Sequence, residues 1–130
     1  MRYNIVAVDF DGTLCSDEFP GVENINTHAV EVLKKYRQRG GKLILWTCRH
    51  DKPLKDAVEA LRALGLEFDA INANIPEHVK EWTEKTGDTT FSPKVHADLY
   101  IDDKAVRLSE VFGDSGGLDW IAISMLLRRE

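Results

Sequence analysis

Apolar residues recur along this chain as short continuous runs separated by longer segments with helical spacing. Continuous apolar runs of four to five residues are typical of strands buried on both faces of a parallel sheet. They predict strands at 5–8, 42–46, 68–71 and 98–101. Each run is bounded by glycine, asparagine or acidic residues, which are typical of turns and strand ends.

Between these runs, apolar residues at i, i+3, i+4 and i+7 predict two amphipathic helices. The first follows the capping residues at 26–27 and ends at the glycines 40–41, and the second opens at Asp51 and Pro53 and ends before Gly65. Their apolar positions are Ala29, Val32, Leu33 and Tyr36 in the first helix, and Leu54, Ala57, Val58 and Leu61 in the second.

The alternation of strands and helices predicts an α/β fold with a central parallel sheet and helices on both faces, a three-layer sandwich. Residues 72–97 are the least patterned part, with a helix over 77–85 as the candidate element. The segment 120–127 predicts a helix, or a last strand followed by a helix, and the glycines within 113–117 predict a plain turn. The length fits a single domain over 1–130.

Composition narrows the function classes. A net charge of −5 argues against tight binding of nucleic acid, and no segment approaches the roughly 20 apolar residues of a membrane helix. The chain opens directly on a strand, without the basic and apolar segments of an export signal. Cys15 and Cys48 are too few for a disulfide framework. We therefore expect a cytoplasmic protein with no membrane partner.

Side chains that can bind a metal ion or a phosphate follow three of the four predicted strands. Asp9 and Asp11 follow the first, Thr47 and Arg49 follow the second, and Asp102–Asp103 follows the fourth. Carboxyl ends of parallel strands meet at one edge, where open α/β sheets bind ligands, so we expect these groups to converge. Clustered carboxylates need a cation or a shared proton, and hard oxygen ligands favour Mg²⁺ over zinc.

These residues resemble the motifs of the haloacid dehalogenase (HAD) superfamily of phosphatases and phosphotransferases. Asp9-Phe10-Asp11-Gly12-Thr13 resembles its first motif, Thr47 its second, and Tyr100-Ile101-Asp102-Asp103 its fourth. The motifs occur in the family's order over nearly the full chain. The resemblance implies a Rossmann-like HAD core, and no segment here is long enough for a large cap domain over the site.

The resemblance also implies a Mg²⁺-dependent phosphatase that hydrolyses a phosphomonoester through an aspartyl-phosphate. Asp9 is then the nucleophile and Asp11 the general acid and base. The metal ligands are the Asp9 side chain, the Asp11 backbone carbonyl, and one or both of Asp102 and Asp103.

Three further residues receive roles from the same resemblance. Thr47 donates its hydroxyl to a phosphoryl oxygen. The catalytic and substrate-binding lysine is Lys94, because the family's lysine precedes the last strand, with Lys104 as the alternative. Arg49 either binds the substrate phosphate or is a surface arginine.

The identity of the substrate stays open. Without a cap, the site is open to solvent or covered by a second subunit of a homo-oligomer, and a phosphorylated small molecule such as a sugar phosphate is the expected substrate. One alternative is a non-catalytic phosphoacceptor module, which also combines aspartates, a threonine and a lysine on a parallel sheet. Another is a nucleic-acid end phosphatase, which the lack of a basic stripe argues against.

Overall fold

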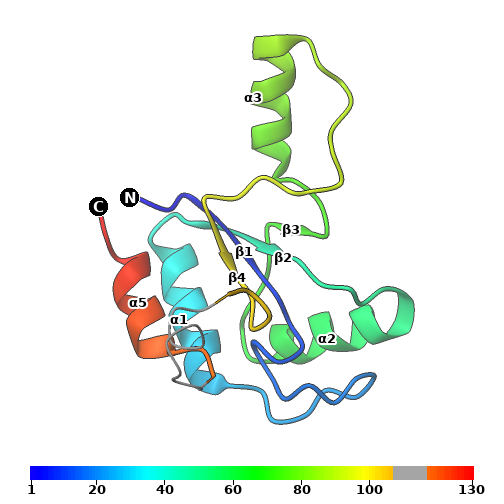
Figure 1. Ribbon diagram of the computed structural model, residues 1–130, viewed down its shortest axis with the longest axis vertical. Coiled ribbons are helices and arrows are strands. Elements are labelled where there is room, and N and C mark those ends of the chain that lie inside the picture. Colours follow the sequence, from blue (N-terminus) through cyan, green and yellow to red (C-terminus); the bar gives the residue numbers. More distant parts are fainter. Residues whose placement is uncertain (107–116) are drawn as a thin grey trace.

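A parallel four-stranded sheet forms the centre of the computed structural model, which describes residues 1–106 and 117–130 (Figure 1). Its strands are β1 (Ile5–Val8), β2 (Lys42–Leu45), β3 (Ala70–Ile71) and β4 (Leu99–Ile101). Their order across the sheet is β3-β2-β1-β4, and every neighbouring pair is parallel. The predicted α/β fold is confirmed. The order places β1 beside β4, which comes from the far end of the chain.

The described helices are α1 (Thr27–Gln38), α2 (Asp51–Ala63), α3 (Pro76–Thr86) and α5 (Trp120–Leu127). The cap predicted for α1 is present, because the side chain of Asn26 accepts a hydrogen bond from the backbone N–H of Ala29 at 3.0 Å. The segment 120–127 is a helix throughout. The turn predicted from the glycines lies, over residues 113–116, outside the described residues.

The two faces of the sheet are covered differently. On the face packed against α1, α2 and α5, the strands contribute Val6, Val8, Leu43 and Leu45. Because side chains alternate along a strand, Ala7 and Ile44 point to the other face, where they pack with Ile75 and Val95 from the segments that flank α3. The layers are thus helices, sheet, and the connection that carries α3.

Helix α3 stands away from the sheet in Figure 1 and has no buried residue. Its first turn contains Pro76, and Gly87 ends it with a left-handed conformation at φ 81°. The predicted helix over 77–85 is therefore confirmed, with one more residue at each end. No helix among the described residues is long and apolar enough to cross a membrane.

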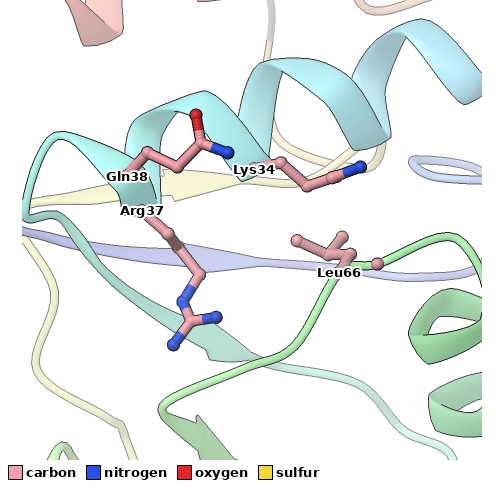
Figure 2. A pocket seen from close by; sticks show the side chains of 5 residues that line it. Lys34, Arg37, Gln38 and Leu66 are labelled. Carbon is pink, nitrogen blue, oxygen red and sulfur yellow. The ribbon is translucent and has the colours of Figure 1, made fainter.

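The amino end of β2 is held by an ion pair between Arg37 of α1 and Asp69. Arg37 donates from Nε and Nη2 to the two Asp69 oxygens at 3.2 and 3.0 Å, and Asp69 also accepts from the N–H of Leu43 at 2.8 Å. Figure 2 shows Arg37 projecting from α1. Arg37 and Leu66 both line a cavity of about 270 Å³. This pair fixes the start of β2, the opposite end of that strand from Thr47.

Candidate active site

The turn after β1 brings its carboxylates to the edge of the sheet. The N–H of Asp9 still donates to the carbonyl of Ile101 in β4, at 2.9 Å. The chain then turns sharply, with Leu14 donating to the carbonyl of Phe10 at 2.8 Å and Gly12 in a left-handed conformation at φ 80°. A Cβ atom at Gly12 would collide with the carboxylate of Asp103. Glycine is therefore required here both by the backbone and by the approach of the β4 turn.

Thr13 joins the turn after β1 to the turn after β4. Its buried hydroxyl lies 3.1 Å from Asp9 Oδ2 and 3.3 Å from Asp103 Oδ1, and it accepts a hydrogen bond from the N–H of Asp103 at 3.0 Å. This contact spans 90 residues of sequence. The hydrogen bonds of Thr13 therefore fix the turn that carries Asp9 relative to the turn that carries Asp103.

Asp9, Asp102 and Asp103 form one acidic cluster, in which one carboxylate oxygen from each lies within 4.8 Å of the others. Burial, with a further contribution from the charge of Asp102, raises the pKa of Asp9 to about 7. Three carboxylates at this spacing repel one another, and hard oxygen donors of this kind suit a divalent cation such as Mg²⁺. The donor set therefore fits the metal that the sequence predicts.

The side chain of Asp11 faces Arg49 instead of this cluster. Arg49 donates from Nε to Asp11 Oδ2 at 2.8 Å and from Nη2 to Asp11 Oδ1 at 2.7 Å. Its other N–H groups donate to the carbonyls of Pro20, Gly21 and Pro53 at 2.6 to 3.1 Å. All five guanidinium donors are thus satisfied within the protein.

Arg49 is only 2% exposed, so it is not a surface arginine. It lines the site cavity, but its five N–H groups all donate to acceptors of the protein itself. This geometry favours a structural role for Arg49 over the predicted role in binding the substrate phosphate. No sequence pattern indicated its five acceptors, because three of them are backbone carbonyls, and two of these belong to Pro20 and Gly21 in a loop without periodicity.

A cavity of about 350 Å³ opens at this edge of the sheet. The ends of β1, β2 and β4 line it together with the loop after β1. Its lining includes Asp9, Asp11, Phe19, Thr47, Asp102 and Lys104. The convergence predicted from parallel topology is therefore present in the structure.

The two candidate lysines lie in different places. Lys104 lines the site cavity, with its Nζ 3.8 Å from Asp103 Oδ2 and 3.9 Å from Asp17 Oδ2. Lys94 lines a separate cavity with Trp82, near α3, and its Nζ lies 5.2 Å from the centroid of the Tyr100 ring. The structure therefore does not bring Lys94 to the cavity that holds Asp9.

Thr47 is fixed at the end of β2 by Asn72, a residue that the sequence analysis missed. The N–H of Thr47 donates to Asn72 Oδ1 at 2.8 Å, and the Thr47 hydroxyl accepts from the N–H of Arg49 at 3.1 Å. Accepting that bond leaves the hydroxyl proton available to a ligand. Asn72 has a φ of 51° directly after β3, and its position at a strand end was the available signal, since asparagine tolerates this conformation.

A parallel α/β core that presents an aspartate cluster, a threonine and a lysine at the carboxyl edge of its sheet has the design of a HAD core. A sequence profile of haloacid dehalogenase-like hydrolases matches residues 6–104, and the chain belongs to this family. It is also similar to a solved structure described as a conserved protein coded by a locus of Bacteroides thetaiotaomicron. The two share 38% identity over 95% of this chain and 88% of that chain, with a TM-score of 0.74. Among curated proteins, no significant match was found.

Proposed function

We propose that this protein is a Mg²⁺-dependent phosphatase that hydrolyses a phosphomonoester through an aspartyl-phosphate. The observation that carries the proposal is the acidic cluster of Asp9, Asp102 and Asp103, of which Asp9 and Asp102 line the site cavity. Asp9 belongs both to this cluster and to the cavity, so one carboxylate can meet a cation and a phosphoryl group together. Membership of a hydrolase family supports the same reaction class.

In the first half of the reaction, an Asp9 oxygen attacks phosphorus and the bond to the leaving oxygen breaks. Asp11 supplies the proton that the leaving oxygen takes up. Arg49 uses one lone pair on each Asp11 oxygen, and a carboxylate has about four, so Asp11 retains sites for a proton. In the second half, Asp11 takes a proton from water as the water attacks phosphorus, which releases inorganic phosphate and restores Asp9.

The remaining groups stabilise charge. Asp9, Asp102 and Asp103, together with the backbone carbonyl of Asp11, would hold the Mg²⁺ ion, which supplies positive charge that lets a carboxylate approach a phosphate dianion. Thr47 donates its free hydroxyl proton to a phosphoryl oxygen. Lys104 provides the fixed cation, a role for which we prefer it to Lys94 because it lines the site cavity.

The shape of the site favours a small substrate. A cavity of about 350 Å³ accommodates a phosphorylated metabolite such as a sugar phosphate. Phe19 lies at this cavity with 60% of its surface exposed, which offers an apolar contact for the leaving group. The net charge of −5 argues against a nucleic-acid substrate.

The test is release of inorganic phosphate from a panel of phosphorylated metabolites, nucleotides, peptides and DNA ends, with MgCl₂ or with EDTA. Asp9→Asn is expected to lose at least about 10³-fold in kcat, because covalent catalysis requires the carboxylate. The matched control is Asp88→Asn, an exposed acidic residue outside the site cavity and the cluster, which is expected to stay within about threefold of wild type.

Acid quenching during turnover is expected to trap an alkali-labile phosphoprotein in wild type and none in Asp9→Asn. Substantial turnover by Asp9→Asn would refute the proposal. A phosphoprotein that is stable for minutes, with no Mg²⁺-dependent release of phosphate, would indicate a phosphoacceptor module instead.

A further inference from the structure

We propose that Arg49 is a positioning residue, which holds the Asp11 carboxylate and the loop over residues 16–24 in their working places. The inference rests on the proposed function, because it assigns Arg49 an effect on catalysis through Asp11. It goes beyond that function by giving a role to a side chain whose N–H groups all donate to the protein itself.

The burial of Arg49 is the first argument. A charged side chain that is only 2% exposed is strongly destabilising unless it is paired and fully hydrogen-bonded. Arg49 meets this condition with a two-point pair to Asp11 and three backbone carbonyls. The Phe10 and Phe19 rings also contact the guanidinium, with centroids 4.9 and 5.2 Å from its central carbon.

The second argument is what these contacts connect. Asp11 belongs to the turn after β1, Pro20 and Gly21 belong to the loop that follows it, and Pro53 belongs to the first turn of α2. One guanidinium therefore ties three separate segments together at the wall of the site cavity. Removing it frees the Asp11 carboxylate to rotate and releases the loop that carries Phe19.

The planar fork of arginine is important for this role. Two parallel N–H groups fix both the position and the orientation of a carboxylate, which the single ammonium of lysine does not do. A misplacement of about 1 Å in a reacting group lowers turnover by about 10²-fold. Loss of Arg49 is therefore expected to lower kcat even though Asp11 is still present.

Arg37 offers a matched control. It makes the same two-point contact with a carboxylate, that of Asp69, at the amino end of β2. It lies outside the lining of the site cavity. Arg37→Met thus removes an equivalent two-point ion pair and leaves Asp11 and the loop over 16–24 unchanged.

The experiment is a double-mutant cycle that measures kcat and KM for p-nitrophenyl phosphate with saturating Mg²⁺. Arg49→Met is expected to lower kcat by about 10²-fold, with KM changed less than about threefold. In an Asp11→Asn background, the same substitution is expected to change kcat by less than about threefold, because the carboxylate it positions is gone. Arg49→Lys is expected to recover part of the loss, and Arg37→Met is expected to leave kcat within about threefold of wild type.

An equal loss of kcat on Arg49→Met in wild type and in the Asp11→Asn background would overturn the inference. Such additivity means that Arg49 acts independently of Asp11, for instance by holding the loop alone. If Arg49→Met does not fold, Arg49→Lys in both backgrounds completes the cycle, because it keeps the buried positive charge. Asp9-dependent phosphatase activity with an additive cycle defeats only this inference, whereas hydrolysis that does not depend on Asp9 defeats the proposed function as well.

Discussion

Replacing Asp9 by Asn is expected to stabilise the metal-free protein, and to do so more strongly as the pH rises. The hydroxyl of Thr13 donates to Asp9 Oδ2 at 3.1 Å. Asn has the same shape as Asp, and its side-chain oxygen still accepts this hydrogen bond. What it removes is a carboxylate whose pKa is raised from 3.8 to about 7 by burial and by the charge of Asp102. The folded protein therefore holds a proton that the unfolded chain has lost between these two pH values, so stability falls as the pH rises through them.

The size of the effect follows from the two pKa values. The difference between 3.8 and about 7 corresponds to about 4 kcal/mol of lost stability above pH 7. Because the Asp9 side chain is only partly buried, screening by solvent reduces this to about 2 kcal/mol. For a chain of 130 residues, that is a rise of about 7 °C in Tm for Asp9→Asn at pH 8. At pH 5 the gain is expected to fall below about 1 kcal/mol, because wild-type Asp9 is then mostly protonated when folded.

The assay is thermal unfolding of both proteins in EDTA at pH 5 and pH 8, followed by circular dichroism. Addition of MgCl₂ is expected to reverse the order at pH 8, because an ion at 100 times its Kd stabilises wild type by about 2.7 kcal/mol and the variant has lost a ligand. Asp88→Asn, at an exposed position outside the site cavity, serves as the control and is expected to follow wild type at both pH values. The reasoning is refuted if Asp9→Asn is less stable than wild type at pH 8 in EDTA, or if the difference between them does not depend on pH.

Three further outcomes are expected. Gly12→Ala is expected to lose more than about 1 kcal/mol of stability and to weaken Mg²⁺ binding in calorimetry, because its Cβ displaces the Asp103 carboxylate. Gly40→Ala, with φ 99° and no atom within 4 Å of its Cβ, is the control that retains Mg²⁺ binding. Thr47→Ala is expected to lower kcat by about 10²-fold while Thr47→Ser retains most of it, as steady-state kinetics will show. Burial raises the pKa of Asp69, but hydrogen bonds from its arginine partner and a backbone N–H outweigh this and hold it below 3.8. Asp69→Asn is therefore expected to be less stable than wild type at pH 7 in thermal unfolding, with a deficit that disappears as the pH falls below 3.8 and the wild-type carboxylate is protonated.

Most of the fold could be predicted from sequence because its signals are local. Asn26 caps α1 by bonding to Ala29, which is close to it in sequence. The continuous apolar runs mark β1 and β2 directly. The acidic cluster could also be predicted, although Asp9 and Asp103 are far apart in sequence. Parallel topology alone brings the carboxyl ends of strands to one edge, and this rule needs no knowledge of side-chain contacts.

The contacts that escaped prediction depend on the paths of irregular segments. Two carbonyls of the loop over residues 16–24 accept hydrogen bonds from Arg49. The path of this loop has no periodic pattern in the sequence from which these contacts could be predicted. Likewise, the choice between Lys94 and Lys104 depends on the segment between α3 and β4. That segment directs Lys94 toward the ring of Tyr100. Lys104 lies in the turn after β4 and therefore lines the site cavity.

The position of β4 beside β1 has a consequence for synthesis on the ribosome. Until residues 99–103 have emerged, β1 has an open edge, the hydroxyl of Thr13 has no partner from the second acidic segment, and two of the three carboxylates of the cluster are absent. A nascent chain that stops short of β4 is therefore expected to have no affinity for the ion and no ability to attack a phosphate ester. Under the proposed function, the order of synthesis therefore delays phosphatase activity until the second acidic segment has been made.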